Sequence, residues 1–244
     1  MQLHKNKILI TGATAGIGAA LLQVFLDLDN EIIAVGRNES KLAELSKVDK
    51  RIIPFKCDIS RQEELDRLTQ FVEQQHKDLN ILINNAGIQY NYNFGNEHQL
   101  LSKIENEINV NFLAPLKLIA LLLPTLQLNS NSAIVNISSG LAIVPKAQAP
   151  VYCGTKAAIH NFSKSLRYQL KKVKVFEIIP PIVDTAMTAG RGKGKISPKK
   201  LADEFINAFK KDQYEVNIGK VKLLRIINRM VPGIAERIMK GLTP

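Results

Sequence analysis

Apolar residues along the chain gather in short runs that alternate with longer amphipathic segments. Seven runs are rich in β-branched side chains: KILIT, EIIAVG, RIIPFK, LNILIN, SAIVNIS, VKVFEII and YEVNIG. Uninterrupted apolar runs of about 4 to 8 residues indicate strands covered on both faces, and the helix-length spacers between them indicate crossover helices. The pattern predicts an α/β fold in which about seven parallel strands form one doubly wound sheet.

The length of the chain fits one domain of this kind, because its 244 residues contain neither a repeat nor a low-complexity segment. We expect a single domain over 1–244. Inside it, the segment 185–212 is predicted to be a substrate loop or lid, since it opens with TAMTAGRGKGKISPKK and holds three glycines. The segment 220–244 is predicted to form two short amphipathic helices that break at Pro232 and Gly233.

The most membrane-like stretch is VNFLAPLKLIALLLPTLQL, residues 110–128. Polar residues and two prolines, the second being Pro124, keep it short of the run of about 20 apolar residues that a transmembrane helix needs. We therefore expect a buried helix whose end is marked by proline. Because no export signal opens the chain, and because Cys57 and Cys153 show no disulfide or metal-ligand spacing, we expect a reduced, cytoplasmic protein without a metal.

Charge is spread unevenly along the chain. Of the net charge of +11, the residues from Arg191 onward contribute +8, with 13 Lys and Arg against 5 Asp and Glu. A basic surface attracts nucleic acid, anionic lipid or acidic ligands. The basic part of the sequence has no zinc-ligand pattern, no obvious recognition helix and few interleaved aromatic residues, so we expect no nucleic-acid partner.

A glycine-rich segment follows the first predicted strand directly. TGATAGIG, residues 11–18, separates KILIT from the helical pattern AALLQVFLDL. Glycines at positions 12, 16 and 18 allow the backbone to turn tightly, to approach a pyrophosphate and to pack a helix against a strand. This context predicts dinucleotide binding, with the phosphates at the helix N-terminus.

Further cofactor contacts are expected where the next strands end. The second strand is followed by Gly36 and Arg37 instead of the carboxylate that binds the ribose of NAD, and an arginine there can hold a 2′-phosphate. We therefore expect NADP(H) to be preferred over NAD(H). Asp58 and the segment Asn85 to Gly87 follow the third and fourth strands, at the edge where ligands of such sheets bind.

Two tyrosines each precede a lysine by four residues, Tyr152 with Lys156 and Tyr168 with Lys172. Residues with this spacing share a helix face, but tyrosines 16 residues apart on one helix point in nearly opposite directions. Only one of them can face the cofactor. Ser139 lies 13 residues before Tyr152, at a strand end, which favours Tyr152 and Lys156 as the reactive pair.

A tyrosine that exchanges protons near neutral pH needs a pKa well below the ordinary value of about 10. A lysine ammonium about 4 Å away, at an effective dielectric constant of about 20, supplies about 4 kcal/mol, or roughly 3 pKa units before desolvation. We therefore expect Lys156 to lower the pKa of Tyr152.

Taken together, these motifs resemble those of the short-chain dehydrogenase/reductase family in its classical subtype. TGATAGIG, NNAG, VNFLAP with Asn111, and the set of Ser139, Tyr152 and Lys156 follow the family's order and spacing over about 7–190. The C-terminal pattern of IGK followed by LLRIINRMVP is also similar to a bacterial branch labelled DltE-like. The resemblance implies a Rossmann fold and a homodimer or homotetramer.

The same resemblance implies the roles of individual residues. Tyr152 would be the general acid/base, Ser139 would polarise the substrate oxygen, Lys156 would bind the nicotinamide ribose, and Asn111 would hold a relay water. Asp58 would contact the adenine, and Thr185 the nicotinamide carboxamide. The implied cofactor-binding set is Gly12, Thr14, Gly16, Ile17, Gly18, Arg37, Asp58, Ile59, Asn85, Ala86, Gly87, Tyr152, Lys156 and Thr185.

Three positions depart from the family pattern or compete with it. Pro181 stands where the family usually has glycine after the sixth strand, and its fixed φ and missing N–H leave that cofactor contact open. Ser138 is a rival to Ser139, although the spacing favours Ser139. Cys153 follows the tyrosine where a small residue is common, and we interpret it as a packing residue.

The leading interpretation is an NADP(H)-dependent oxidoreductase that moves hydride between nicotinamide and a small carbonyl or alcohol substrate, with Tyr152 exchanging the proton. Two alternatives stay open. One is a nucleotide-binding scaffold or sensor without turnover. The other is the same enzyme held weakly on an anionic membrane through its basic C-terminus, where Lys220, Lys222, Arg225 and Arg229 interleave with apolar residues.

Overall fold

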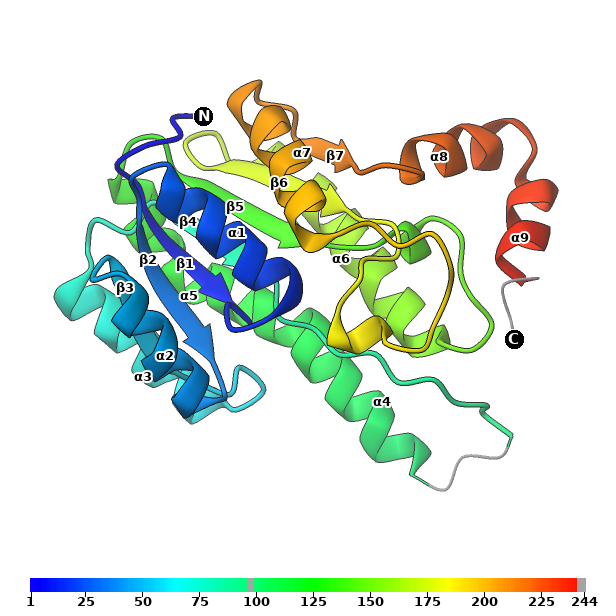
Figure 1. Ribbon diagram of the computed structural model, residues 1–244, viewed down its shortest axis with the longest axis horizontal. Coiled ribbons are helices and arrows are strands. Elements are labelled where there is room, and N and C mark those ends of the chain that lie inside the picture. The colour runs from blue at the N-terminus through cyan, green and yellow to red at the C-terminus, as the bar shows by residue number, and fades with distance from the viewer. Residues whose placement is uncertain (96–98, 241–244) are drawn as a thin grey trace.

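Seven parallel strands form one sheet at the centre of the computed structural model, which describes residues 1–95 and 99–240 (Figure 1). Across the sheet they are β3 (Ile52–Lys56), β2 (Glu31–Gly36), β1 (Lys7–Thr11), β4 (Ile81–Asn84), β5 (Ala133–Ile137), β6 (Lys174–Ile179) and β7 (Glu215–Asn217). Each strand coincides with one of the predicted apolar runs. The prediction of a doubly wound parallel sheet is confirmed.

The order of the strands reverses between β1 and β4, which pair in parallel through Ile8 with Ile81 and Ile10 with Ile83. The chain winds outward from β1 to β3, then crosses back to β4 and winds to the other edge. In open sheets of this kind, ligands bind at the carboxyl ends of the two central strands, because the connections leave there in opposite directions.

Helices cover both faces of the sheet (Figure 1). One face carries α1 (Gly16–Asp27), α2 (Glu39–Val48) and α7 (Pro198–Lys210). The other carries α3 (Gln62–Gln75), α5 (Ala114–Leu128) and α6 (Pro150–Gln169), with α4 (Leu100–Ile108) leading into α5 through a π-helical turn, Asn109–Leu113. Because both faces are covered, consecutive residues of the inner strands β2, β1, β4, β5 and β6 are buried whichever way they point, whereas the edge strands β3 and β7 are only partly buried.

Helix α7 packs on α1 in the core. Phe205 and Phe209 are fully buried, and their ring centroids lie 6.4 and 6.0 Å from that of Phe25. The segment 185–212, predicted as a lid, therefore divides into two parts. Only 185–197 is a loop that can cover a site, whereas α7 is a buried structural helix.

Helix α5 does not end at its second proline, so this prediction was wrong. The helix continues through Pro124 to Leu128. Pro124 cannot donate a hydrogen bond to the Ala120 carbonyl, but both residues lie on the exposed side of the helix, where water can bond that carbonyl. Asn129 marks the actual end, since its Nδ2 donates to the Thr125 carbonyl at 2.9 Å.

The continuous helical stretch Leu100–Leu128 is long and apolar enough to cross a membrane by length and composition. Its apolar side is used inside the fold instead. Leu118, Leu122 and Leu126 are fully buried in the hydrophobic cluster that α5 shares with α3 and the sheet. The expectation of a buried helix is confirmed for this part of the chain.

The C-terminal segment forms α8 (Val221–Met230) and α9 (Pro232–Lys240). The predicted break is present, because α8 ends at Met230 with Val231 as its C-cap and Pro232 takes the first position of α9, where its missing N–H costs nothing. Residues 241–244 of the predicted C-terminal segment lie outside the described residues. In Figure 1 the two helices extend away from the body of the protein at one end of the molecule.

Replacing Phe209 by alanine tests the role of α7 in the core. We expect Phe209→Ala to lower the free energy of unfolding by about 3 to 5 kcal/mol, since it empties a buried aromatic site. Urea unfolding measures this change. Tyr168→Ala is the control, because Tyr168 is 65% exposed and its loss should change stability by no more than about 0.5 kcal/mol. Equal effects of the two substitutions would contradict the packing of α7.

Candidate active site

Close backbone contacts shape the glycine-rich turn between β1 and α1. Gly12 has a φ of +66° and Gly16 a φ of +56°, a left-handed conformation that glycine adopts without strain. A Cβ atom at Gly18 would lie 2.2 Å from the Gly12 carbonyl oxygen and 2.5 Å from Asn85 Nδ2. The absence of a side chain at Gly18 therefore allows α1 to press against the turn.

This turn fits the phosphate end of a dinucleotide. Within the described residues, no side chain caps the first amide groups of α1 and no acid lies in its first turn. Free N–H groups at a helix N-terminus favour an anion. Thr185, which follows β6, has its Cγ2 3.0 Å from the Cβ position of Gly16. Gly12, Gly16, Ile17 and Gly18 would therefore hold a pyrophosphate with Thr185 beside it.

Arg37 and Asp58 lie at the ends of the next two strands. Partial burial opposes the ionisation of Asp58, but hydrogen bonds from Ser60 and the charge of Arg37 together hold its pKa below the usual value. Arg37 itself is exposed, which leaves its guanidinium accessible to a ligand. Thr14 packs against the end of β2, and Ile59 is 7% exposed. These residues would flank the adenosine half of the cofactor.

Asn85 ties the end of β4 to the glycine-rich turn. Its Nδ2 donates to the carbonyl oxygens of Thr11 at 2.8 Å and of Gly12 at 3.2 Å. The backbone N–H groups of Asn85 and Ala86 both donate to Thr11 Oγ1, at 3.0 and 3.1 Å. The NNAG segment is therefore a structural brace in addition to a predicted cofactor contact.

Asn111 and Lys156 meet at Gly87, just beyond this brace. A Cβ atom at Gly87 would lie 3.2 Å from Asn111 Oδ1 and 3.6 Å from Lys156 Nζ. Asn111 lies in the π-helical turn and forms two hydrogen bonds with the backbone of Ile88. Its Oδ1 accepts the Ile88 N–H at 2.8 Å, and its Nδ2 donates to the Ile88 carbonyl at 2.8 Å. Lys156 is 5% exposed, and its Nζ donates to the Ile137 carbonyl at 2.8 Å. Backbone groups therefore hold both side chains in place, those of the segment after β4 for Asn111 and that of the last residue of β5 for Lys156.

Ser139 and Tyr152 converge from the end of β5 and the first turn of α6. The Ser139 hydroxyl lies close enough to Tyr152 to favour the tyrosinate form through a hydrogen bond. Ser139 Oγ also accepts the N–H of Leu141 at 3.1 Å. Ser138 is turned away, since it is 1% exposed and its hydroxyl donates to the Ile178 carbonyl at 3.4 Å. The structure brings Ser139, and not its rival, to the tyrosine.

The pKa of Tyr152 differs from the expectation. Burial raises it to about 12, and the hydrogen bond from Ser139 offsets only part of this rise. Lys156 Nζ is bonded to the Ile137 carbonyl and lies 5.6 Å from the centroid of the tyrosine ring, and the pKa stays raised with the ammonium at this distance. Burial also lowers the pKa of Lys156 to about 8. Desolvation disfavours the charged form of both groups.

The second Tyr-Lys pair lies away from this site. Tyr168 is 65% exposed on α6, and Lys172 follows the end of that helix at Gln169. The two tyrosines therefore point in different directions, as the helical geometry predicts. Cys153 is buried, and its Sγ accepts the N–H of Lys146 at 3.3 Å, which agrees with a packing role.

Sequence reasoning missed Glu107, a carboxyl group that borders the site. It is fully buried on α4 and accepts the N–H of Tyr90 at 2.9 Å and the hydroxyl of Tyr92 at 3.0 Å. Burial raises its pKa, although these hydrogen bonds oppose the rise. Glu107 therefore holds the QYNYNF segment in place. Its position four residues before Asn111, one helical turn away, was the available signal.

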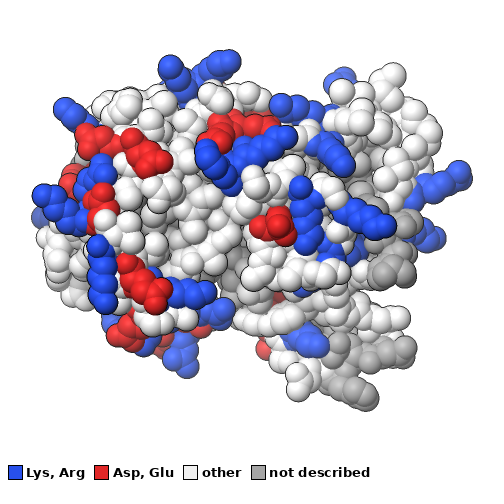
Figure 2. All heavy atoms as spheres, in the orientation of Figure 1, with Lys and Arg blue, Asp and Glu red and all other residues white. Residues whose placement is uncertain are grey.

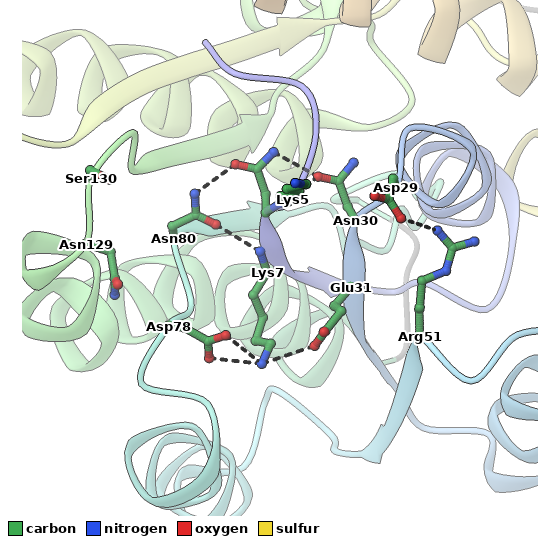
Figure 3. A pocket seen from close by; sticks show the side chains of 11 residues that line it. Lys5, Lys7, Asp29, Asn30, Glu31, Arg51, Asp78, Asn80, Asn129 and Ser130 are labelled. Atoms are coloured by element: carbon green, nitrogen blue, oxygen red, sulfur yellow. Dashed lines mark hydrogen bonds and ion pairs between the residues drawn. The ribbon is translucent and has the colours of Figure 1, made fainter.

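A polar hollow of about 370 Å³ lies at the opposite, amino-terminal end of the strands (Figure 3). Its lining groups largely satisfy one another. Asn80 Nδ2 donates to Asn6 Oδ1 at 2.8 Å, and Lys7 Nζ pairs with Asp78 at 2.8 Å and Glu31 at 3.1 Å. These bonds join the starts of neighbouring strands, so we interpret the hollow as structural and place the candidate site at the carboxyl edge.

Comparisons with known proteins point to one family. The family described as short chain dehydrogenase matches residues 6–195. The uncharacterized oxidoreductase DltE of Bacillus subtilis (strain 168) is 38% identical over 237 residues, which cover 94% of each chain. The uncharacterized oxidoreductase MW2403 of Staphylococcus aureus (strain MW2) is 30% identical over 239 residues, covering 91% of this chain and 98% of its own.

Solved structures have the same fold. A short chain dehydrogenase from Burkholderia cenocepacia J2315, in complex with NADP, matches with a TM-score of 0.88 and 27% identity over 100% of both chains. A short chain dehydrogenase/reductase from Burkholderia phymatum, in complex with NAD, matches with a TM-score of 0.84 and 16% identity over 100% of this chain and 98% of its own. The second likeness shows the fold alone.

A single added methyl group tests the glycine-rich turn. We expect Gly18→Ala to weaken NADPH binding about tenfold or more and to lower the unfolding temperature, because the new Cβ displaces the Gly12 carbonyl or the Asn85 amide. Calorimetric titration and thermal unfolding measure the two effects. Gly233→Ala is the control, since its Cβ meets nothing within 4 Å among the described residues. Undiminished NADPH binding by Gly18→Ala would show that the turn does not hold the cofactor.

Proposed function

The chain belongs to the short-chain dehydrogenase family, in the DltE-like branch, and from this premise we propose that it is an NADP(H)-dependent carbonyl reductase that also catalyses the reverse alcohol oxidation. It is an oxidoreductase by family. The observation that carries the finer proposal is the convergence of Ser139 and Tyr152 next to Lys156, at the carboxyl edge of the sheet and beside the glycine-rich turn.

The residues at this edge suit the transfer of a proton to a carbonyl oxygen. Bound NADPH supplies the hydride that the carbonyl carbon accepts. Tyr152 donates its hydroxyl proton to the carbonyl oxygen as negative charge develops there, and Ser139 orients the same oxygen by a hydrogen bond. Lys156, fixed on the Ile137 carbonyl, places a positive charge next to the tyrosinate that results.

The protonation state of Tyr152 in the free protein is that of a general acid. A phenol whose pKa is raised to about 12 by burial holds its proton at neutral pH. A protonated tyrosine is ready to act as a general acid, which carbonyl reduction requires, whereas alcohol oxidation starts from the tyrosinate. The ordinary state of the free protein therefore suits reduction.

Support for NADP(H) comes from Arg37. This exposed guanidinium follows β2, where a cofactor phosphate on the ribose 2′-oxygen would lie, and an arginine binds phosphate through paired charge-assisted hydrogen bonds. The Burkholderia cenocepacia relative, 27% identical, is in complex with NADP. The charge of Arg37 also helps to hold the pKa of nearby Asp58 below its usual value.

Two loops form the walls beside Tyr152 and would receive the substrate. Arg191, in the loop 185–197, donates from Nη1 to Asn91 Oδ1 at 3.3 Å, which joins this loop to the QYNYNF segment. The charge of Arg191 also reaches Tyr152 and lowers its pKa slightly against the effect of burial. Tyr90, which is half-buried, adds aromatic surface. The proposed substrate is a small carbonyl compound, with 185–197 as its lid.

The proposed enzyme works as a homo-oligomer in the cytoplasm. Oligomerisation follows from the family pattern of the sequence. The cytoplasm suits Cys57 and Cys153, which are both free and buried.

Cofactor preference is tested at Arg37. We expect Arg37→Ala to weaken NADPH binding about 10- to 100-fold, because charge-assisted hydrogen bonds to a phosphate contribute about 1.5 to 3 kcal/mol, while NADH binding changes less than about twofold. Calorimetry on the purified protein measures both. Arg61→Ala removes an exposed arginine at the same edge and should leave the ratio of the two affinities unchanged. A wild-type protein that prefers NADH would refute the NADP(H) assignment.

Proton transfer is tested at Tyr152. Tyr152→Phe removes one hydroxyl group, and we expect NADPH oxidation with a panel of ketones and aldehydes to fall about 10²- to 10⁴-fold. NADPH affinity should stay within about threefold, and Tyr168→Phe should keep full activity. Retained turnover in Tyr152→Phe would remove the tyrosine from the mechanism. A wild-type protein that binds NADPH but reduces no carbonyl compound would instead favour the nucleotide-binding scaffold.

A further inference from the structure

Helices α8 and α9 expose a stripe of large apolar side chains. On α8, Leu223, Ile226 and Met230 are 60%, 61% and 74% exposed. On α9, Ile234 and Ile238 are 50% and 46% exposed. The spacing of three or four residues places the members of each helix on one face. We call these five side chains the apolar stripe.

The inner face of α8 is fastened to the body, which fixes the direction of the apolar stripe. Val221 is 2% exposed, and its Cγ2 lies 3.3 Å from the Cβ position of Gly140, next to the reactive Ser139. Arg225, one turn later, forms an ion pair with Glu215 of β7. These contacts hold one side of α8 against the body, so the opposite side of α8, with its part of the apolar stripe, faces outward.

Basic side chains border the apolar stripe. In the sequence, residues 220–240 contain six lysines and arginines and one acid, Glu236. On a helical wheel, Arg229 lies beside the stripe on α8 and Arg237 beside it on α9. Figure 2 shows blue and white surface, with little red, on the right-hand side of the molecule where Figure 1 places these helices.

An exposed apolar face with a basic border fits an anionic lipid surface. A second copy of this chain would bring Arg229 and Arg237 against the same two cations, which disfavours the pairing of these faces. A lipid surface accepts the apolar side chains at the acyl boundary and the cations at the headgroups. Helices of 10 and 9 residues are too short to span the bilayer and can only lie on it.

We propose that α8 and α9 form a docking surface for an anionic lipid membrane. The apolar stripe enters the interface, and Arg229 and Arg237 bind the lipid headgroups. This inference does not depend on the reaction that the enzyme catalyses. Because the inner side of α8 contacts Gly140, docking brings the Ser139 end of the active site to the membrane.

Sedimentation of the full-length protein with vesicles tests the docking surface. The vesicles are made of phosphatidylcholine alone or of equal parts of phosphatidylcholine and phosphatidylglycerol. We expect at least tenfold stronger partitioning to the anionic vesicles, and a loss of at least tenfold in 0.5 M NaCl. Ile226→Ser with Met230→Ser should weaken binding about tenfold or more, and Arg229→Gln with Arg237→Gln should do the same.

Matched controls carry the same changes elsewhere. Val48→Ser alters an apolar side chain on α2 that is 72% exposed, and Lys47→Gln with Lys50→Gln removes two charges beside it. Both should bind vesicles within about twofold of the wild type. NADPH binding by every variant confirms that the fold is intact.

Two outcomes overturn the proposal. One is a wild-type protein that does not sediment with anionic vesicles at low salt. The other is unchanged vesicle binding after Ile226→Ser with Met230→Ser, which would remove the apolar stripe from the contact. Light scattering identifies the competing occupant, because a wild-type oligomer that this double variant converts to monomers, without vesicle binding, would assign the surface to a second copy.

Discussion

The hydrogen bonds between Asn85 and the glycine-rich turn are the constraint on which the rest of the site depends. Asn85 Nδ2 reaches the carbonyl oxygens of Thr11 and Gly12, and its N–H reaches Thr11 Oγ1. The pairing of β1 with β4 ends at Ile10 and Ile83, one residue before Thr11, so β4 does not bond these groups through its ladder. A buried backbone donor or acceptor that is left without a hydrogen-bond partner lowers the stability of the fold by about 1 to 3 kcal/mol. The brace therefore allows the sheet edge to open for a ligand while its backbone stays bonded.

A second set of buried polar groups fixes the reactive helix relative to the sheet. Asn84 on β4 donates to Asn136 on β5, and Asn136 donates to Ser163 on α6, each at 2.9 Å. The Lys156 ammonium adds a bond from α6 to the Ile137 carbonyl. A shift of α6 along β5 would break several buried polar contacts at once, which costs more than rearranging apolar side chains. The reactive groups on the strand end and on the helix therefore keep their relative positions.

Sequence patterns predicted what depends on local geometry. The inner strands are buried on both faces and therefore have a continuous apolar composition, and the helical repeat alone separates Tyr168 from Tyr152. What depends on the folded environment could not be predicted in this way. The raised pKa of Tyr152 comes from burial, Pro124 is tolerated because its side of α5 faces water, and Glu107 gains its role only when α4 meets the QYNYNF segment.

Charges behind the reactive helix determine how the C-terminal surface is presented. His160 Nδ1, on α6, lies 2.9 Å from a carboxylate oxygen of the fully buried Glu177 on β6. Glu177 is in register with Glu215 on the neighbouring strand β7. Glu215 in turn forms an ion pair with Arg225 of α8. His160, Glu177 and Glu215 offer ligand atoms of the kind a divalent cation takes, within 4.8 Å of one another, but Arg225 already supplies a positive charge there. A carboxylate buried at this position is costly without such compensation. Arg225 therefore faces Glu215 on the inner side of α8. The orientation of α8 is therefore set by β7 at the edge of the sheet and by Gly140 next to Ser139, so α8 is tied directly to the segment that carries a reactive residue.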